Sequence, residues 1–473
     1  MKYTLQFIAL IVCLADCLAF IQTLRKPYRG PQQSNETNEF EKLNVTTKWI
    51  TQKLDNFDDN NTKVWSNRYH IYEDYFSHGS PIFVWLGGES KVDPDMKVLL
   101  WEEIAKEHNG SLIYTEHRFY GKSIPIRPYS NENLKYLSTE QALADVVHLI
   151  KTLKKEDKYK NSKVLVLGCS YAGSMAVWLK KLYPDLVVGV WASSAPLLAK
   201  VDYPEHFQVA GQSYKKLGGI ECYNRIKNAI SFYEDLWNQG NITELKKILN
   251  ICDDFDAKYE YNRYDLFMTI ASNFSDIAQF QRPHLFTIKE HCVQMLKSDD
   301  DAMAVSQFIH KQVENPRCLS INNQQFIDKI NLVRDNCDKP FLCWAYQTCS
   351  EFGWYQSTNG DGQPFGSSVP VQYSINTCQK VFGAHFTREK IEANVKATNE
   401  KFGGLNPNVT NVYLTHGELD PWSKVGAGIA QGATIIPNAS HCNDMQSITE
   451  EDSLELVASK RRLMSLVRKW LAE

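Results

Sequence analysis

Short apolar runs alternate with helix-like segments through the first part of the chain, and this alternation constrains the fold more than any other feature. The runs are PIFVWL (81–86), SLIYTE (111–116), KVLVL (163–167) and VVGVWASS (187–194). Segments of helical character, notably 94–108 and 139–155, lie between them. Because near-continuous apolar strands joined by helices are typical of sheets covered on both faces, we predict a mostly parallel sheet in an α/β domain.

The pattern changes twice along the chain. Closely spaced aromatic residues from 46 to 76 predict an early antiparallel meander. Between 201 and 400 the periodicity becomes helical, and strand-like runs return only at 411–415 and 433–437. The chain therefore leaves the sheet and comes back to it.

These changes predict one α/β domain in two parts, 46–200 and 401–473, interrupted by a mainly helical insertion, 201–400. With 43% hydrophobic residues, the chain can fill the core that such an arrangement needs. A last helix is expected from about Glu450, with Thr449 as its N-cap.

The first 19 residues, MKYTLQFIALIVCLADCLA, have the features of a secretory signal peptide. Lys2 precedes an apolar run, and small residues end the segment at Ala19. That run is too short to span a bilayer, and no later stretch reaches 18 uninterrupted apolar residues, so we expect a soluble mature chain without a membrane span. Residues 20–45 are polar and rich in turn formers, which indicates a lead-in or propeptide.

Twelve cysteines, less Cys13 and Cys17 in the signal peptide, leave ten. An even number behind a signal peptide indicates disulfides, and eight of the ten crowd the region 222–378. The other two, Cys169 and Cys442, could lie near each other as a pair or as free thiols, and the sequence favours ordinary buried cysteines. Because the sequence has no CxxC or HExxH motif, we expect no metal and no cofactor.

Eight N-x-S/T sequons follow the signal peptide, and several should carry surface glycans. They are at Asn35, Asn44, Asn60, Asn109, Asn241, Asn273, Asn408 and Asn438. Together these features predict a secreted or lysosomal protein. The net charge of −3 and the pI near 6.5 argue against a nucleic-acid partner.

The string Gly168-Cys169-Ser170-Tyr171-Ala172-Gly173 joins the strand KVLVL to a helical run. A nucleophile elbow requires this context, because a sharp strand-to-helix turn lifts the serine hydroxyl clear of the sheet. The usual pattern has Gly two residues after the serine, whereas here Ala172 takes that place and Gly173 follows. The sequence thus predicts Ser170 as a nucleophile.

A catalytic serine needs a base and an orienting carboxylate, which follow it in the order Asp, His in α/β-hydrolases. Asp420 lies in a loop beyond the strand NVYLT, and His441 lies beyond the strand ATIIP. Both should therefore reach the sheet edge where Ser170 lies. Asp444 and His416 are rivals, but neither fits the expected order as well.

An oxyanion hole needs two converging N–H donors. The backbone N–H of Tyr171, directly after the nucleophile, is the first candidate. The turn after PIFVWL offers Gly88 as the second, because glycine lets the backbone approach a substrate closely. The polar group 116–118 follows a strand at the same edge, and we expect a buried, salt-bridged support for the nucleophile turn.

Nine strings carry a resemblance to a known family. They are QKLDNF (52–57), RYHIYEDYF (68–76), VWLGGES (84–90), EHRFYGKS (116–123), YLSTEQALAD (136–145), GCSYAGSMAVW (168–178), YQTCSEFGW (346–354), HGELDPW (416–422) and SHCNDM (440–445). In this order they resemble the prolyl carboxypeptidase and dipeptidyl peptidase II family of serine peptidases. Ser174, YQTCSEFGW and SHCNDM are nearest to its thymus-specific serine protease branch.

The resemblance implies an α/β-hydrolase fold with a helical, disulfide-bonded cap inserted after the strand that follows the nucleophile helix. It also implies peptidase action after proline by Ser170, Asp420 and His441. Trp422 would then help to wall an apolar pocket for the residue before the cleaved bond.

The resemblance further implies a cap disulfide between Cys349 and Cys378. The sequence departs from the family at two positions. Cys169 stands where many members have Gly. Ser174 stands where prolyl carboxypeptidase has a bulky apolar residue that contacts the proline pocket, which weakens the expectation of a strict proline preference.

We therefore predict a serine exopeptidase that hydrolyses short peptides through an acyl-enzyme. Carboxypeptidase and dipeptidyl peptidase action are both left open. An esterase or lipase on the same fold, or a secreted binding protein without catalysis, are the alternatives. Peptides are the expected partners, and a homodimer is left open.

Overall fold

The computed structural model describes residues 44–93, 99–252, 254–282, 287–312, 318–333 and 340–473. The predicted signal peptide, Asn35 and nearly all of the predicted lead-in lie outside these residues.

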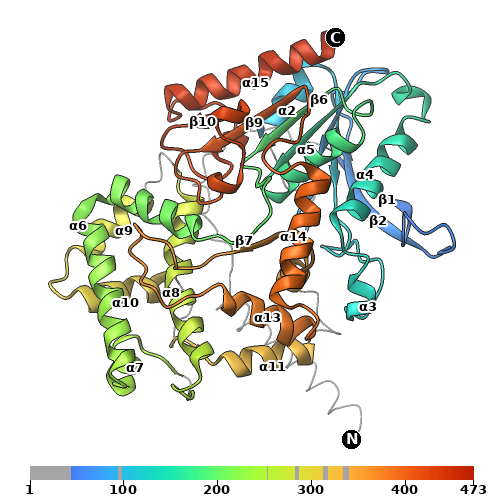
Figure 1. The fold of residues 1–473 in the computed structure, drawn as a ribbon. Helices are drawn as coiled ribbons and strands as arrows, with labels where there is room; N and C mark the ends of the chain where they lie inside the picture. The colour runs from blue at the N-terminus through green and yellow to red at the C-terminus, as the bar shows by residue number, and fades with distance from the viewer. Residues whose placement is uncertain (1–43, 94–98, 253, 283–286, 313–317, 334–339) are drawn as a thin grey trace, which may run out of the picture.

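Eight strands form one sheet in the spatial order β1-β2-β4-β3-β5-β6-β9-β10 (Figure 1). Their bounds are β1 (Val45–Lys53), β2 (Val64–Tyr72), β3 (Ile82–Trp85), β4 (Ser111–Thr115), β5 (Val164–Cys169), β6 (Gly189–Ser193), β9 (Val412–Gly417) and β10 (Thr434–Ile436). β1 pairs antiparallel with β2, and β2 with β4, whereas the other neighbouring pairs are parallel. The prediction of a mostly parallel sheet after an antiparallel meander is confirmed.

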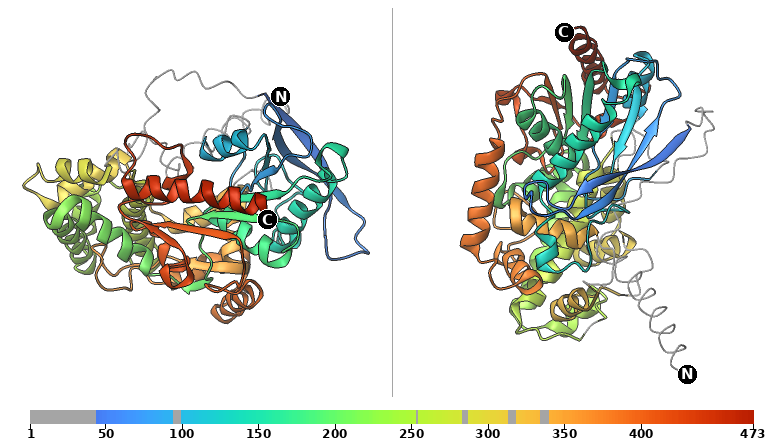
Figure 2. Two further views of the ribbon diagram at one scale, coloured as in Figure 1. Left: turned by 90° about the horizontal axis from the view of Figure 1, so that it is seen from above. Right: turned by 90° about the vertical axis from the view of Figure 1, so that its right-hand side faces the viewer.

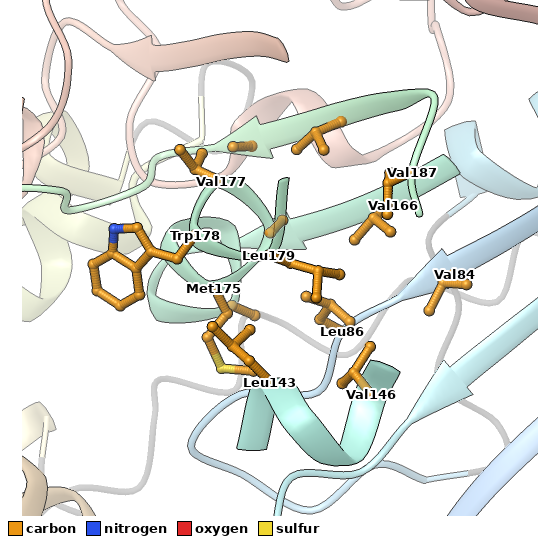
Figure 3. Close-up of a cluster of buried hydrophobic side chains, with 14 of the residues drawn as sticks. Val84, Leu86, Leu143, Val146, Val166, Met175, Val177, Trp178, Leu179 and Val187 are labelled. Carbon is orange, nitrogen blue, oxygen red and sulfur yellow. The ribbon is translucent and has the colours of Figure 1, made fainter. Parts of the chain in front are cut away.

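Helices cover both faces of the sheet. They are α2 (Leu99–Glu107), α4 (Thr139–Leu153), α5 (Tyr171–Leu182) and α15 (Leu454–Ala472). On one face, Val84 of β3 lies in an apolar cluster with Met175 of α5 and side chains of α4 (Figure 3). On the other face, Phe83 of β3 lies in a cluster with Trp101 of α2 and Trp470 of α15. Since alternate strand residues face opposite sides, burial on both sides explains the near-continuous apolar runs. This is an α/β-hydrolase fold.

The chain leaves the sheet after β6 and returns to it at β9, and the intervening insertion forms a mainly helical lobe (Figures 1 and 2). Its elements are β7 (Lys200–Asp202), α6 (Glu205–Asn238), α7 (Ile242–Ile248), α8 (Glu260–Phe280), α9 (Thr287–Met295), α10 (Asp301–Gln312), α11 (Asn323–Val333), α12 (Pro340–Gln347), the π-helical turn η2 (Thr348–Phe352), β8 (Gly353–Tyr355), α13 (Gln372–Phe382) and α14 (Arg388–Phe402). Three disulfides tie it together: Cys222–Cys292, Cys252–Cys318 and Cys349–Cys378.

Short helical turns complete the chain. They are α3 (Asn131–Leu134), η1 (Asp157–Tyr159), η3 (Ser423–Val425), η4 (Ile429–Gln431) and η5 (Asn443–Met445). Within the described ranges, no helix combines the length and the apolar character needed to cross a bilayer.

The C-terminal helix begins a few residues later than the sequence predicted. Ser453, in extended conformation, is its N-cap, and its hydroxyl accepts the Leu456 N–H at 3.2 Å. The predicted cap, Thr449, instead donates its N–H to Asp452 at 3.3 Å, and Asp452 also pairs with Lys460 at 2.5 Å. The acidic residues before the helix thus form a turn of their own, and the N-cap is the serine that follows them.

Seven of the eight sequons lie within the described residues. Six of their asparagines are exposed: Asn44, Asn60, Asn109, Asn241, Asn408 and Asn438. Asn273 differs, because it is half-buried in the middle of α8 and its amide donates to the Thr269 carbonyl oxygen at 2.8 Å. The surface is therefore open to glycans at six positions, whereas Asn273 already has a local partner.

Candidate active site

Ser170 occupies a strained turn between β5 and α5. Its φ of 59° and ψ of −132° are unusual for a residue with a side chain, and such backbone strain is concentrated at functional sites. The Ser170 N–H donates to the Ser193 carbonyl oxygen at 2.9 Å, which ties the turn to β6. Gly168 is required here, because an added Cβ would lie 2.0 Å from the Ala172 carbonyl oxygen. These are the features of a nucleophile elbow.

His441 and Asp420 form a buried pair at the same edge of the sheet. Asp420 follows β9 and His441 follows β10, as Ser170 follows β5, so all three lie at carboxyl ends of parallel strands. The His441 Nδ1 atom lies 3.0 Å from each carboxylate oxygen of Asp420. The Trp422 N–H also donates to this carboxylate, at 2.9 Å.

Electrostatics keep the Asp420 carboxylate charged. Burial alone would raise its pKa, but His441 and His416 face it and together hold the pKa well below its usual range. An ionised Asp420 can accept the Nδ1–H of His441 and so fix the tautomer whose Nε2 is free to accept a proton.

The two rival residues have other contacts. Asp444 is buried and accepts hydrogen bonds from the hydroxyls of Ser193 (2.5 Å) and Thr415 (2.6 Å), so it holds two strand ends together. His416 lies on β9 with its Nδ1 3.8 Å from an oxygen of Asp420. Asp444 therefore does not orient His441, whereas His416 does face the acid.

A disulfide joins Cys169, the residue before the nucleophile, to Cys442, the residue after His441. The sequence favoured two ordinary buried cysteines here, and that interpretation is wrong. Its physical cause is tertiary: Cys442 follows β10, and its N–H donates to the Ser194 hydroxyl at 2.9 Å, which brings its sulfur to the end of β5. Although the Cys169, Cys442 and His441 ligand atoms lie within 4.8 Å of one another, both sulfurs are used by the disulfide.

The two candidate oxyanion donors lie side by side. Tyr171 is the first residue of α5, so its N–H has no partner within the helix. A Cβ built on Gly88 would lie 3.6 Å from the Ala172 backbone nitrogen, which puts the Gly88 turn against the start of α5. Burial raises the pKa of the next residue, Glu89, while nearby His441 acts in the opposite direction.

The phenol of Tyr171 is anchored in a buried network. The His117 Nδ1 lies 2.7 Å from the Arg118 carbonyl oxygen and must donate to it, so its Nε2 accepts the Tyr171 hydroxyl at 3.1 Å. Gln347 and Thr139 hold the same oxygen at 2.9 and 3.2 Å. Burial lowers the pKa of His117 to about 4, so the imidazole stays neutral.

Two buried ion pairs support this region, as the sequence predicted for segment 116–118. Glu116 pairs with Arg68, and Arg118 pairs with Asp145 of α4 at 2.7 Å. All four side chains are almost fully enclosed. The pairs connect β2, the segment after β4 and α4 behind the nucleophile turn.

Trp422 stands where the sheet domain meets the insertion. Its ring contacts Tyr203, His206 and Trp354, with centroids 5.9, 5.2 and 6.0 Å away. Its indole N–H donates to the Gln279 side-chain oxygen at 3.1 Å. The resemblance pointed to Trp422, but the partners from the insertion carry no local sequence signal.

The end of α8 also holds the segment that carries His441. The His441 N–H donates to the Gln279 carbonyl oxygen at 3.1 Å, and the Ser440 hydroxyl donates to the Ala278 carbonyl oxygen at 2.5 Å. Sequence analysis missed these contacts, because they join residues more than 160 positions apart.

Ser174 is fully buried on α5. Its hydroxyl donates to the Pro196 carbonyl oxygen at 2.7 Å, which fastens the segment after β6 to the nucleophile helix. That hydroxyl is therefore already engaged within the protein.

One edge of a mostly parallel sheet carries a strained serine turn, a buried Asp–His pair and the N-terminus of α5. These features define a serine hydrolase of the α/β-hydrolase fold. Residues 52–463 match the family described as serine carboxypeptidase S28. The chain belongs to this peptidase family.

Curated relatives agree along nearly the full length. A putative serine protease of Caenorhabditis elegans is 28% identical over 94% of this chain and 91% of that protein. The thymus-specific serine protease of Mus musculus is 27% identical over 90% of this chain and 87% of its own. The lysosomal Pro-X carboxypeptidase of Bos taurus is 26% identical, with 91% and 89% covered. These similar levels of identity leave the nearest branch of the family unassigned.

Proposed function

We propose that this protein is a serine exopeptidase that hydrolyses short peptides after proline through an acyl-enzyme on Ser170. The observation that carries the proposal is the buried His441–Asp420 pair at the sheet edge where the strained Ser170 turn also lies. Since Nδ1–H is held by Asp420, the Nε2 of His441 is the atom that takes the proton from the attacking serine. Tyr171 and Gly88 supply the N–H donors for the oxyanion.

The aromatic side chains around Trp422 support proline as the residue before the cleaved bond. Trp422 is the partly exposed member of this aromatic group, and the buried rings of Tyr203, His206 and Trp354 hold it in place. Its indole therefore offers a rigid apolar face that suits a compact ring without a backbone N–H donor. The name of the bovine relative, Pro-X carboxypeptidase, is consistent with this assignment.

Arg282 favours carboxypeptidase over dipeptidyl peptidase action. It lies two residues after the end of α8 and three residues after the carbonyl that binds the His441 N–H, and the charge of Asp444 acts on it. Burial lowers the pKa of this guanidinium, and within the described residues its side chain makes no hydrogen bond or ion pair. A partly buried guanidinium of this kind suits the C-terminal carboxylate of a peptide.

The disulfides and exposed sequons support a site of action in the secretory pathway, either outside the cell or in the lysosome. Peptides are the proposed substrates, and a homodimer stays a prediction.

Labelling with a fluorophosphonate probe tests the catalytic assignment. We expect the purified protein to be labelled at pH 5 and pH 7, and the folded Ser170→Ala variant to remain unlabelled, because the probe reacts only with an activated serine. A folded wild-type protein that takes up no label at either pH would contradict the proposal and favour a binding protein without catalysis. Hydrolysis of simple esters without hydrolysis of proline peptides would favour the esterase alternative.

A further inference from the structure

The catalytic carboxylate faces a second imidazole. His416 lies on β9, four residues before Asp420, and its Nδ1 is 3.8 Å from an oxygen of that carboxylate. Neither side chain has any exposed area. Since 3.8 Å is too long for a hydrogen bond, the contact is electrostatic, and burial makes it stronger than it would be in water.

The surroundings of His416 favour one tautomer of the ring. A Cβ added to Gly426 would lie 2.1 Å from both Nε2 and Cε1, so that edge of the ring is pressed against the glycine backbone. Among the described residues, neither ring nitrogen has a hydrogen-bond partner. A doubly protonated ring would bury an Nε2–H without an acceptor, which is costly. The neutral tautomer with Nδ1–H directed at Asp420 satisfies the site best.

Few other charges face this group within the described chain. His441 contacts Asp420 directly, and Glu89 interacts electrostatically with His441. The Tyr203 hydroxyl donates to the Pro421 carbonyl oxygen at 2.6 Å. Burial raises the pKa of Tyr203 well above its usual value, so this phenol is neutral. Lys424 on η3 is exposed, and the neighbouring strand segments, Ile435 on β10 among them, are uncharged.

We infer that His416 is a positioning residue that acts through Asp420 and keeps His441 available as a base in acidic solution. The inference rests on the proposed function. The positive end of the His416 N–H dipole weakens the negative potential that Asp420 exerts on His441. Protonated His441 is then less stabilised, so the base is lost to protonation only at lower pH.

The sign of the effect gives a direct test. In His416→Leu the dipole is absent, the Asp420 potential at His441 is more negative, and the imidazolium is stabilised. In a plot of labelling rate against pH, the acid limb, where the rate falls because His441 becomes protonated, should then move to higher pH by roughly half a unit. Below that limb the rate should fall about threefold, while the plateau rate at higher pH should stay nearly unchanged.

The rate of fluorophosphonate labelling between pH 4 and pH 8 is the readout, because it needs no substrate assignment. His416→Phe is a second variant without an N–H donor. If only one of the Leu and Phe variants folds, that variant is used for the test. His416→Gln restores a neutral N–H donor and should return the limb toward the wild-type position. His310→Gln is the control, because His310 binds the Leu249 carbonyl oxygen within the insertion, at 3.0 Å.

An acid limb that coincides with that of the wild type in a folded Leu or Phe variant, or that moves to lower pH, would overturn the inference. A limb that shifts equally in the Gln and Leu variants would also overturn it, because a neutral donor would then have no effect. Failure of the proposed function is distinguishable, since the wild type itself would then take up no label.

Discussion

Tyr171 presents two chemically separate groups to the site. Its main-chain N–H, at the first position of α5, has no partner within the helix and is the proposed oxyanion donor. Its phenol, by contrast, is buried away from that N–H, and His117, Gln347 and Thr139 surround the phenol oxygen. Burial raises the pKa of the phenol well above its usual value. The side chain thus anchors the backbone that the chemistry uses.

Removing this hydroxyl should cost stability more than chemistry. In Tyr171→Phe, the His117 Nε2 and the Gln347 amide lose a buried partner, so we expect the free energy of unfolding to fall by about 1–3 kcal/mol. Denaturant titration measures this change, and Tyr223→Phe on α6 is the matched control. Because the N–H donor is retained, fluorophosphonate labelling of the folded variant should persist. Unchanged stability would show that the network contributes nothing.

At the scale of elements, the π-helical turn η2 is packed against the start of α4. Glu351 of η2 accepts the Thr139 N–H with its two oxygens, at 3.0 and 3.1 Å, where a helix N-terminus favours negative charge. Burial nevertheless dominates and raises the pKa of Glu351 to about 7. The contact between these two elements should therefore depend on pH.

The sign of this dependence follows from the direction of the shift. Between the ordinary pKa of Glu and about 7, the folded protein holds a proton that the unfolded chain has released, so stability falls as pH rises. In Glu351→Gln this loss is absent, and stability relative to wild type should improve by about 3 kcal/mol from pH 4 to pH 8.

Thermal unfolding of the two proteins across this range tests the assignment to Glu351. Glu389→Gln is the control, because Glu389 is exposed at the start of α14. Parallel stability curves for wild type and Glu351→Gln would contradict the assignment.

At the scale of the whole molecule, the insertion reaches into the active site of the sheet domain. The end of α8 holds the backbone of His441, the hydroxyl of Ser440 and the indole of Trp422. Arg282 lies two residues after the end of α8, where the charge of Asp444 acts on it. The proposed base, the proposed proline contact and the proposed charge for the substrate terminus thus all adjoin one helix end.

Arg282 should matter only for peptides with a free C-terminus. In Arg282→Ala we expect KM for a proline peptide with a free C-terminal carboxylate to rise roughly 10- to 100-fold, because one charge-assisted contact is lost. KM for the same peptide with a C-terminal amide should change little. Steady-state kinetics on the matched acid and amide measure the difference, and Arg282→Lys should recover part of it. Equal effects on both peptides would refute carboxylate binding, and a selective loss for peptides with a free N-terminus would favour dipeptidyl peptidase action.

Local patterns predicted the sheet well, because each strand is a short apolar run between helices. β3 and β4 lie inside the predicted runs, and the strands β9 and β10 end just before Asp420 and His441 as expected. The sequence left a Cys169–Cys442 pair open but favoured ordinary buried cysteines, because local patterns do not give the distance between two strand ends. The Gln279 contacts could not be foreseen, because they arise only when the insertion packs against the sheet domain. The sequence offered His416 only as a rival to His441, and its contacts with Asp420 and with the Gly426 backbone appear only in the folded chain.

The Cys169–Cys442 disulfide joins positions 273 residues apart, and the whole insertion lies between them. Every peptide bond from Ser170 to His441 therefore belongs to one covalent ring. A single proteolytic cut anywhere in the insertion would give two polypeptides, one carrying Ser170 and the other carrying Asp420 and His441. The Cys169–Cys442 bridge would still hold the two fragments together, so a chain cut once in the insertion would remain a single covalent molecule.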